Sequence, residues 1–557
     1  MTIRSYLEKY AAETPSAAAL KYFGGDKQWH ERSWADFLAG VASTADAYGP
    51  KFGLKPGVEN VALILPNCAT WMEAYLAQAG AGVSVVPVDP KLHNSEVEYI
   101  LRDSGAVVVT TDKAHLLMMQ AIAPNLPDLR AVVIVDGGKP TYDAIGDVAV
   151  YDYANLRNGA TKGWFAAHVA KPEDVASVIY TSGTTGKPKG AMLTHGNFIS
   201  DISGGLEAFG EKVDNTDSLL VVLPLFHAFS FCTNFVLGLY RGCTMQFVRS
   251  LYTIGEDVKL LQPTLFMSVP LLAEKMYAKI DAKLKGSAVA RSLMKFGICG
   301  LKKLVTANIK KGLGGKLRFM IVGGAPCPKH VLQGYKELGI TVLEGYGLTE
   351  CSPVVSIAGP KCARIGTIGQ KLSNIEVRLA DQNDQGVGEL QIKGPITMKG
   401  YWHNEEATKE AFDGEWLKTG DLASMDEFGL LTIRGRKKAL IVNREGKNIY
   451  PEEVENRIAV DPLVADCVVV GYTTGGVPGE KVGCVVHPNE DLVKELPDGA
   501  NMSWEAIVKL VNDRVHAQCA ELADYKRVRK VVVSKEPLER TSIQKVRRVA
   551  YKGTLDE

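Results

Sequence analysis

The feature that most constrains this fold is the alternation of short apolar runs with helical patterns in the first four hundred residues. Runs rich in β-branched residues occupy 61–65, 83–88 and 107–110, with helical patterns at 70–78 and 95–103 between them. The alternation resumes at 175–180, 219–223, 265–269, 319–322 and 341–343. Continuous apolar strands separated by helices are typical of parallel sheets that are covered on both faces. The sequence therefore predicts an α/β fold.

The pattern changes near residue 377. Runs at 377–379, 388–392 and 429–433 alternate apolar with polar residues, as half-buried antiparallel strands do. We therefore predict a large N-terminal domain over 1–436, built from layered α/β subdomains and a small β subdomain at about 370–436. Residues 437–557 have an α+β pattern of their own, long enough for a separate C-terminal domain.

Composition excludes several classes of protein. The 557 residues carry a net charge of +1, which gives no basis for whole-chain binding to nucleic acid. No run approaches the roughly 18–20 apolar residues of a membrane span, and the first residues lack the apolar core of a signal peptide. The ten scattered cysteines contain no C-x-x-C pair, so no zinc site or disulfide framework is indicated. We expect a soluble, cytoplasmic protein.

One segment, 275–318, is strongly basic, with twelve lysine and arginine side chains against one acid. Met276, Ile280 and Leu284 fall at helical spacing within it. A basic amphipathic helix can lie on an anionic membrane surface, so peripheral contact with the inner membrane face is one hypothesis. The favoured interpretation is a solvated basic face whose apolar stripe packs on the core.

The strongest local signal follows the apolar run at 175–180. Four hydroxyls, three glycines and two lysines occur within residues 181–190, and the segment begins Thr181, Ser182, Gly183, Thr184, Thr185, Gly186, Lys187. Glycines let backbone N–H groups turn toward an anion, hydroxyls donate hydrogen bonds and lysines neutralise charge. The spacing of the glycines does not fit a Walker A loop. We predict a phosphate-binding hairpin, with an ordinary turn as the alternative.

Further motifs occur in order along nearly the whole chain. They are Leu223-Pro224-Leu225-Phe226-His227, Gly323-Gly324-Ala325-Pro326, Glu344-Gly345-Tyr346-Gly347-Leu348-Thr349-Glu350, Gly400-Tyr401-Trp402, Trp416-Leu417-Lys418-Thr419-Gly420-Asp421, Gly435-Arg436-Lys437-Lys438, 446–455 and 540–545. With the hairpin, this set resembles the adenylate-forming superfamily of acyl-CoA synthetases, luciferases and peptide-synthetase adenylation domains. It is most similar to bacterial long-chain fatty acid–CoA ligases.

The resemblance implies roles for the residues that match. Lys545 corresponds to the catalytic lysine, which bridges the substrate carboxylate and the α-phosphate, and His227 to the histidine that gates the carboxylate site. Glu350 corresponds to the magnesium-binding acid, with a hairpin hydroxyl, that of Thr181, as its partner. Taken by residue type alone, Lys545 would be a surface lysine and His227 a core histidine.

The same resemblance implies a nucleotide site, a hinge and a mobile C-terminal domain. The nucleotide is lined by Gly324, Ala325, Glu344, Gly345, Tyr346, Gly347, Thr349, Asp421, Ile433 and Arg436. Asp421 and Arg436 match ribose contacts, and Tyr346 offers a face to adenine. Lys438 matches the hinge about which the C-terminal domain rotates to exchange Lys545 for the Gly446 loop. The implied cofactors and co-substrates are ATP, Mg²⁺ and coenzyme A.

The residues also limit the acid that is activated. No acidic side chain follows Phe226, where amino-acid-activating relatives hold the substrate ammonium, and a buried ammonium without a partner is costly. Phe229 and Phe231 suit an apolar tail. The insertion at 275–318 resembles that of long-chain fatty acyl-CoA synthetases, so we predict a medium- or long-chain fatty acid.

Two alternatives to an acyl-CoA ligase stay open: transfer to the pantetheine of an acyl carrier protein, and a non-catalytic protein that binds nucleotide or acyl groups. Oligomeric state is not readable, and a homodimer is one option. Three departures from the family pattern concern the acceptor step: Glu539 and Gln544 flank the tail loop, Ala439 follows the hinge, and Glu445 precedes Gly446.

Overall fold

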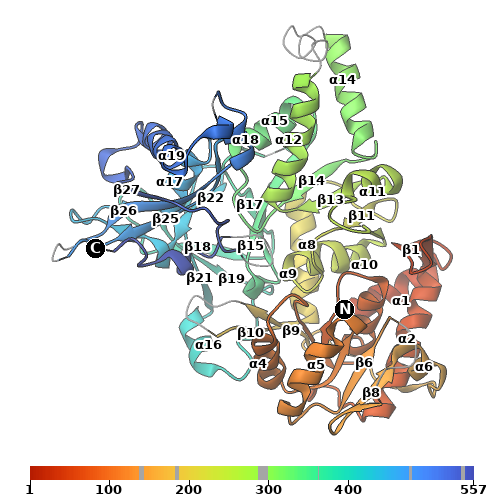
Figure 1. The fold of residues 1–557 in the computed structure, drawn as a ribbon. Helices are drawn as coiled ribbons and strands as arrows, with labels where there is room; N and C mark the ends of the chain where they lie inside the picture. Colours follow the sequence, from red (N-terminus) through yellow and green to blue (C-terminus); the bar gives the residue numbers. More distant parts are fainter. Residues whose placement is uncertain are drawn as a thin grey trace. The chain divides into compact units, whose positions relative to one another are not determined.

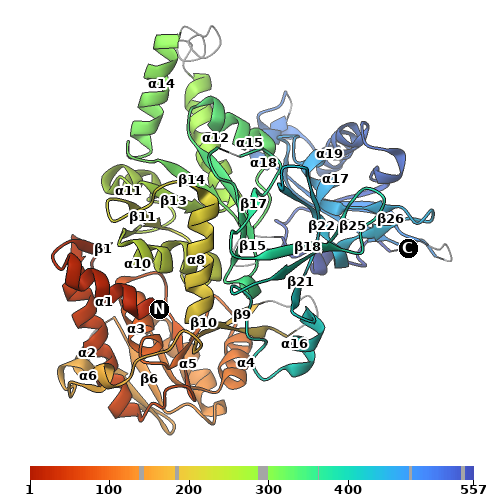
Figure 2. The same cartoon turned by 180° about the vertical axis from the view of Figure 1, so that it is seen from behind.

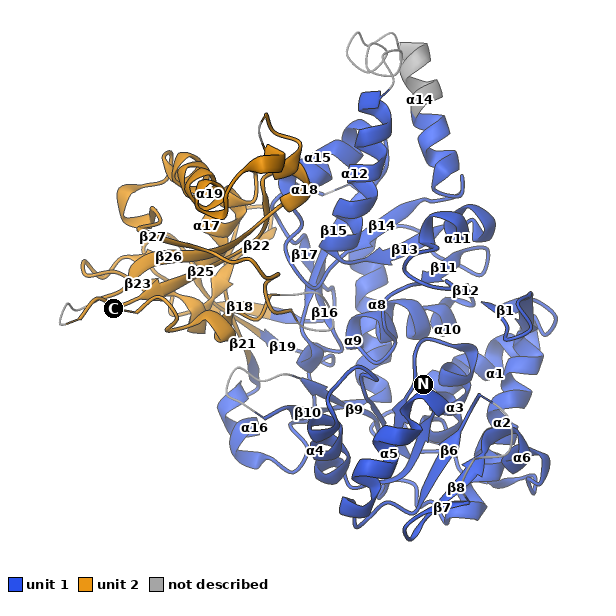
Figure 3. Ribbon diagram, viewed as in Figure 1, with its two compact units in different colours: residues 1–376, 392–417 blue, residues 377–391, 418–557 orange. Residues whose placement is uncertain are grey.

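The computed structural model describes residues 1–136, 143–181, 187–286, 299–361, 363–475, 479–497, 499–540 and 546–556. The chain forms two compact units, shown in blue and orange in Figure 3. Unit 1 comprises Met1–Glu376 and Ile392–Leu417, and unit 2 comprises Val377–Gln391 and Lys418–Glu557. The predicted domain boundary at 436/437 stays a prediction.

In the described part of unit 1, one sheet contains eight strands in the order β10-β9-β4-β3-β5-β6-β8-β7. Its central pairs are parallel, and only the outer pairs β9–β10 and β7–β8 are antiparallel. This arrangement confirms the predicted α/β class. The strands are β3 (Asn60–Ile64), β4 (Ser84–Pro87), β5 (Ala106–Thr111), β6 (Ala131–Ile134), β7 (Ala144–Ile145), β8 (Val148–Asp152), β9 (Val175–Thr181) and β10 (Lys189–Thr194).

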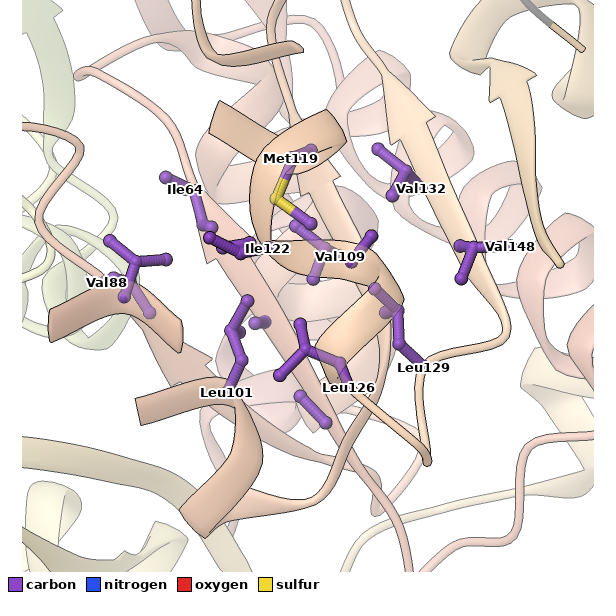
Figure 4. Packing of buried hydrophobic residues seen from close by; sticks show 14 of the residues in the cluster. Ile64, Val88, Leu101, Val109, Met119, Ile122, Leu126, Leu129, Val132 and Val148 are labelled. Atoms are coloured by element: carbon purple, nitrogen blue, oxygen red, sulfur yellow. The ribbon is translucent and has the colours of Figure 1, made fainter. Parts of the chain in front are cut away.

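Helices α4 (Asn94–Ser104) and α5 (Leu116–Ile122) bury one side of this sheet. Figure 4 shows Leu101, Met119 and Ile122 from the helices packed on Val109 and Val132 from the strands. These side chains are almost fully buried. The apolar runs of the sequence thus form a continuous core beneath the hairpin β9–β10.

The second sheet of unit 1 contains nine strands among the described residues, in the order β17-β16-β15-β14-β13-β11-β12-β1-β2. The pairs from β1 through β15 are parallel, and β2, β16 and β17 add antiparallel edges. The strands are β1 (Ala18–Phe23), β2 (Trp29–Ser33), β11 (Ser218–Val221), β12 (Thr244–Phe247), β13 (Leu265–Ser268), β14 (Phe319–Val322), β15 (Val342–Gly347), β16 (Val354–Ile357) and β17 (Gln370–Lys371).

The basic segment forms the helices α12 (Pro270–Gly286) and α14 (Cys299–Gly312), which extend from the sheet that carries β13 and β14 (Figures 1 and 2). Met276, Ile280 and Leu284 are partly buried against the core beneath α11 (Ile254–Leu261) and α15 (Lys329–Glu337). The predicted packing of this apolar stripe on the core is therefore confirmed for α12.

Several further helices complete unit 1, and three of its elements meet in a cluster of aromatic rings. Trp71 and Tyr75 on α3, Phe198 on α8, and Phe231 and Phe235 on the π-helical segment η3 (Phe231–Val236) pack with centroids 4.7–6.2 Å apart. The helices not yet named are α1 (Ile3–Glu13), α2 (Trp34–Phe52), α3 (Ala69–Ala79), α6 (Tyr153–Asn158), α7 (Trp164–Ala167), α8 (His195–Phe209), α9 (Ala228–Ser230), α10 (Leu237–Arg241) and α16 (Glu405–Ala411).

The boundaries between the units fall in a third sheet, which has the order β18-β19-β21-β20 with β22 paired to β21. Its strands are β18 (Glu376–Ala380), β19 (Gly388–Lys393), β20 (Phe412–Asp413), β21 (Trp416–Met425) and β22 (Leu431–Arg436).

The core of unit 2 is a sheet of β25 (Val464–Tyr472), β26 (Lys481–Pro488) and β27 (Lys530–Val533), with α17 (Pro451–Ile458) and α19 (Trp504–Cys519) packed on it. Unit 2 also contains β23 (Ile441–Val442), β24 (Asn448–Ile449) and α18 (Glu490–Lys494). None of the helices in the described part of the chain combines the length and the apolar composition that a membrane span requires.

Candidate active site

The hydroxyl-rich segment connects two antiparallel strands, β9 and β10. Thr181 at the end of β9 pairs with Lys189 at the start of β10, and Tyr180 pairs with Gly190. The two predicted strands are therefore confirmed. Five of the predicted phosphate ligands, Ser182, Gly183, Thr184, Thr185 and Gly186, lie outside the described residues.

The base of this hairpin carries both lysines over aromatic rings. The Nζ atoms of Lys187 and Lys189 lie 5.4 Å from the ring centroids of Tyr99 and Tyr401, respectively. Trp402 N–H donates to the Gly190 carbonyl at 2.7 Å, and Met192 N–H donates to that of Gly400 at 2.9 Å. The motif at 400–402 thus holds β10 and leaves two positive charges at the mouth of the turn.

Glu350 lies beside the same strand. It is on the 3₁₀ turn η4 (Thr349–Cys351), and its Oε1 accepts a hydrogen bond from the Tyr401 hydroxyl at 2.8 Å. Burial and then the Glu350 carboxylate raise the pKa of Tyr401, so this hydroxyl remains a donor. Tyr401 belongs to the motif at 400–402, and no local sequence pattern assigns its hydroxyl a role.

The predicted magnesium ligands, the carboxylate of Glu350 and the hydroxyl of Thr181, are both oxygen donors, the ligand type that Mg²⁺ prefers. This ion takes few protein ligands where phosphates supply the others. Glu350 is joined to β10 through Tyr401, while Thr181 ends the strand that pairs with β10. The two predicted metal ligands therefore belong to one connected group of strands, and their role stays a prediction.

The predicted nucleotide residues of unit 1 gather where two parallel strands end. Gly323, Gly324 and Ala325 follow β14, and Glu344–Gly347 close β15, with Val322 in register with Glu344. Ligands of α/β sheets bind at such carboxyl ends. Gly324 has φ +85°, a left-handed conformation that favours glycine. A Cβ on Gly347 would collide with the Pro353 carbonyl, so that position also requires glycine.

Glu344 has an unusual electrostatic environment within this group. Burial raises the pKa of its carboxyl to about 7. The backbone N–H groups of Gly366 and Cys327 donate hydrogen bonds to the carboxylate and act in the opposite direction on this pKa. The neutral acid is thus well populated at neutral pH.

His227 follows β11 in the chain and is the N-cap residue of the short helix α9. Burial lowers the pKa of His227 to about 4, although Asp89 acts in the opposite direction. The imidazole is therefore neutral at pH 7. A neutral ring can lie beside a substrate carboxylate without adding a charge to the site.

An apolar cavity of about 820 Å³, part of it open to solvent, begins at these strand ends. Gly323, Gly324, Gly345, Tyr346 and Gly347 form one end of its lining, and the rest comes mainly from α8, β13 and the segment that contains Phe229. Phe229 lines it as expected for a tail-binding residue. Phe231 does not, because it is fully buried in the aromatic cluster.

Asp201 on α8 is an ionisable residue in this lining that sequence reasoning missed. It is 1% exposed, and its carboxyl accepts hydrogen bonds from Val354 N–H at 2.8 Å and the Cys232 thiol at 3.1 Å. Burial raises the pKa of Asp201 well above its usual range. The side chain ties α8 to β16 and η3 at the wall of the cavity.

In unit 2, the structure pairs the two predicted ribose contacts. Asp421 and Arg436 are cross-strand neighbours on β21 and β22, and Arg436 Nε lies 2.7 Å from Asp421 Oδ1. Asp421 is buried, while the Arg436 side chain is 45% exposed. Ile433 lies on the same strand as Arg436, opposite Ala423.

The other predicted residues of unit 2 lie on loops. Lys438 is exposed on the 3₁₀ turn η5 (Lys437–Ala439). Gly446, with φ +72°, closes the tight turn between β23 and β24. Lys545 lies outside the described residues. The segments that flank it are joined by an Arg540–Val546 bridge and held by the ion pair between Arg540 and Asp466 at 2.5 Å.

Comparisons with known proteins agree with this geometry. The family model described as AMP-binding enzyme matches residues 7–402. A long-chain-fatty-acid–CoA ligase of Mycobacterium bovis is 33% identical over 469 residues, 79% of this chain and 76% of the relative. A peroxisomal long-chain acyl-CoA synthetase of Arabidopsis thaliana is 30% identical over 90% of this chain and 76% of its own. A long-chain-fatty-acid–CoA ligase of Escherichia coli is 30% identical over 89% and 85%.

Solved structures share the fold. The anthranilate–CoA ligase bound to anthranoyl-AMP aligns with a TM-score of 0.78 at 22% identity, covering 99% of this chain and 96% of that chain. ATP-bound MatB of Rhodopseudomonas palustris aligns with a TM-score of 0.77 at 24% identity, covering 99% and 98%. The predicted α/β fold, with a large N-terminal domain and a smaller C-terminal domain, is therefore confirmed.

Proposed function

Since the chain belongs to the family of AMP-binding enzymes, we propose that it is an AMP-forming ligase that joins a fatty acid to coenzyme A. ATP first converts the acid to an acyl-adenylate with release of pyrophosphate, and the acyl group then passes to the thiol. The relatives that cover most of the chain are named long-chain-fatty-acid–CoA ligases or long-chain acyl-CoA synthetases, which supports an acid with a long apolar tail.

The observation that carries this proposal is that the same residues line the apolar cavity and belong to the predicted nucleotide site. The glycines after β14 and on β15 line the apolar cavity and also belong to the predicted nucleotide site. An acid whose tail fills this cavity therefore presents its carboxylate where the α-phosphate is expected. Burying the tail contributes about 0.8 kcal/mol for each methylene group.

In the first step, a carboxylate oxygen forms a bond to the α-phosphorus of ATP while the bond to pyrophosphate breaks. Both reactants are anions, so cations and fixed dipoles around the phosphates lower the barrier. Lys187 and Lys189 supply positive charge at the hairpin, and neutral His227 adds no negative charge. We assign Lys545 to the bridge between carboxylate and α-phosphate, and Glu350 with Thr181 to a magnesium ion that neutralises phosphate charge.

In the second step, the thiol sulfur of coenzyme A attacks the acyl carbonyl carbon and AMP leaves. We propose that rotation at Lys438 replaces Lys545 by the Gly446 loop for this step, as the family resemblance implies. Such a domain movement can limit turnover. The substitutions at Glu539, Gln544, Ala439 and Glu445 concern this exchange, while Glu350, Asp421, Arg436 and Lys545 all remain.

Pyrophosphate release tests the proposal directly. Purified protein is assayed with ATP, Mg²⁺ and saturated acids from C4 to C18, without acceptor, with coenzyme A, and with a pantetheinylated acyl carrier protein. We expect acid-dependent release and an acyl-CoA product detected by mass spectrometry. If no acid in the panel causes pyrophosphate release, the enzyme proposal is refuted. If an acyl product forms only with the carrier protein, the acceptor is the carrier protein rather than coenzyme A.

Lys545→Ala should lower acid-dependent release at least ~100-fold, the scale of losing one decisive charge at a transition state. Lys552→Ala, at an exposed lysine of the same tail, is the matched control and should change release less than ~2-fold. Equal rates in the two variants would show that another cation acts in adenylation.

The remaining expectations about location and partners are also proposals. Lysines of α12 and α14 give the helical insertion a basic surface, so we propose weak electrostatic contact with anionic membranes at the cytoplasmic face. Sedimentation with phosphatidylglycerol vesicles, compared with phosphatidylcholine vesicles, tests this. A homodimer would be seen as a doubled mass in analytical ultracentrifugation.

A further inference from the structure

Helix α8 contains two adjacent glycines, Gly204 and Gly205, well inside its span of His195–Phe209. Glycine destabilises a helix interior relative to alanine, because it has more freedom to lose on folding. Neither residue has the positive φ that would require glycine. Each therefore needs another physical reason.

For Gly204 the reason is close packing. A Cβ at this position would collide with the side-chain amide of Asn374, whose Nδ2 donates to the Ser200 carbonyl at 2.8 Å. A glycine here lets the loop that carries Asn374 lie directly on the helix.

Gly205 has no such neighbour. A Cβ built on it meets a single atom within contact range, Leu372 Cδ2 at 4.0 Å, which is ordinary van der Waals distance. Gly205 instead lines the apolar cavity. A side chain added at position 205 therefore meets no steric obstacle and borders the cavity.

The position of Gly205 along the cavity follows from α8. Asp201, Gly205 and Phe209 all line the cavity and are spaced four residues apart on one helix face. At about 1.5 Å per residue, Asp201 and Phe209 are about 12 Å apart along the axis, with Gly205 about 6 Å from each.

The sheet gives a second, independent estimate of the distance between the two ends of this stretch. Asp201 is bonded to Val354, the register partner of Gly347 at the nucleotide end. Phe209 packs edge-on against Phe319, the first residue of β14, with centroids 5.1 Å apart. From Phe319 to Gly323, four residues of extended chain cover about 13 Å, which agrees with the helix estimate. Gly205 thus lies at about half the depth.

We propose that Gly205 is the residue that sets the length of the accepted acyl chain, because it keeps the cavity open at half depth. This inference rests on the proposed fatty-acid ligase function. A branched side chain at position 205 closes the deeper half against Phe209 and leaves the nucleotide end intact. The preferred ligand of the native protein is an unbranched acyl tail that passes Gly205.

The test compares Gly205→Leu and Gly205→Ala with wild type, using pyrophosphate release with saturated acids from C4 to C18. The matched control is Gly255→Leu, at an exposed glycine of α11 with no atom within 4 Å of its built Cβ. For Gly205→Leu we expect kcat/KM for the C16 acid to fall at least ~30-fold, while the C6 value stays within ~3-fold. Gly255→Leu should leave the ratio between the two acids unchanged.

Gly205→Ala keeps the test decisive if the leucine variant does not fold. It adds one methyl group, should melt at or above the wild-type temperature, and should lower the C16-to-C6 ratio at least ~3-fold. A ratio equal to that of wild type in this variant overturns the inference. So does an equal loss for all acids in a folded Gly205→Leu protein.

Binding of labelled palmitate and hexanoate, measured by equilibrium dialysis without ATP, separates this inference from the proposed function. Wild type that binds palmitate but releases no pyrophosphate contradicts the proposed function alone. Gly205→Leu that binds palmitate as tightly as wild type contradicts the inference alone.

Discussion

Replacing Tyr401 by phenylalanine removes the hydroxyl that joins Glu350 to the β9–β10 hairpin and leaves the ring beneath Lys189. The lost hydrogen bond, 2.8 Å long, has a carboxylate as its acceptor. Bonds to charged groups contribute about 1.5–3 kcal/mol. If the whole amount appeared in the transition state of adenylation, the rate would fall about 10- to 150-fold, at 1.36 kcal/mol for each factor of ten.

Water reduces this effect, because Glu350 is only partly buried and a water molecule can replace the hydroxyl. We therefore expect the lower limit, about a 10-fold loss in kcat/KM for ATP. The loss should be largest at low Mg²⁺, where a poorly oriented Glu350 limits metal binding. Acid-dependent pyrophosphate release, titrated with Mg²⁺, measures both quantities.

Tyr153→Phe is a chemically matched control. The Tyr153 hydroxyl also donates to a glutamate, Glu73 at 2.9 Å, but within a buried network on α2, α3 and α6 rather than at the hairpin. Both variants should lose stability, and only Tyr401→Phe should change the Mg²⁺ dependence. Identical Mg²⁺ titrations in the two variants would refute the role given to Tyr401.

Three further predictions concern Glu344, His227 and Arg436. Burial raises the pKa of Glu344 from 4.5 to about 7. The folded state should therefore lose up to about 3 kcal/mol of stability as pH rises from 4.5 to 7. Urea unfolding at pH 5 and pH 8 should show this loss in wild type and not in Glu344→Gln. Because burial lowers the pKa of His227 from 6.5 to about 4, stability should fall as pH drops through that interval, and His227→Gln should flatten the same curve below pH 6.5. Arg436→Gln should raise KM for ATP about 10-fold and should also lower stability, because the buried carboxylate of Asp421 loses its charged partner. Equal KM values in titrations of wild type and variant would refute the proposed ribose contact of Arg436.

Much of this arrangement could be predicted from local sequence. The β-branched runs at 61–65 and 107–110 form buried parallel strands. A continuous apolar segment has no polar face that could lie in solvent, so both of its faces must be covered. The hairpin around the hydroxyl-rich turn followed from two apolar runs joined by glycines and Pro188. The family resemblance, rather than local pattern, implied a ribose contact for Asp421 and for Arg436, and their register on β21 and β22 adds the ion pair between them.

Contacts between distant segments could not be predicted in this way. Tyr401 and Glu350 meet because residues 399–402 pair with β10 while η4 follows β15, and no local pattern specifies that pairing. The same holds for Asp201, whose position in α8 predicts a polar residue and whose burial depends on Val354 and Cys232.

Phe229 and Phe231 show where composition stops being informative. Both are aromatic, two residues apart, and both fit a binding site for an apolar tail. The π-helical segment η3 begins at Phe231 and turns its ring into the cluster with Trp71 and Phe235, whereas Phe229, before that segment, stays at the cavity beside Gly323. Wider helical turns of this kind are frequent at functional sites. A local change in helix geometry, rather than residue type, therefore decides which phenylalanine lines the cavity, and the same segment brings Cys232 to Asp201.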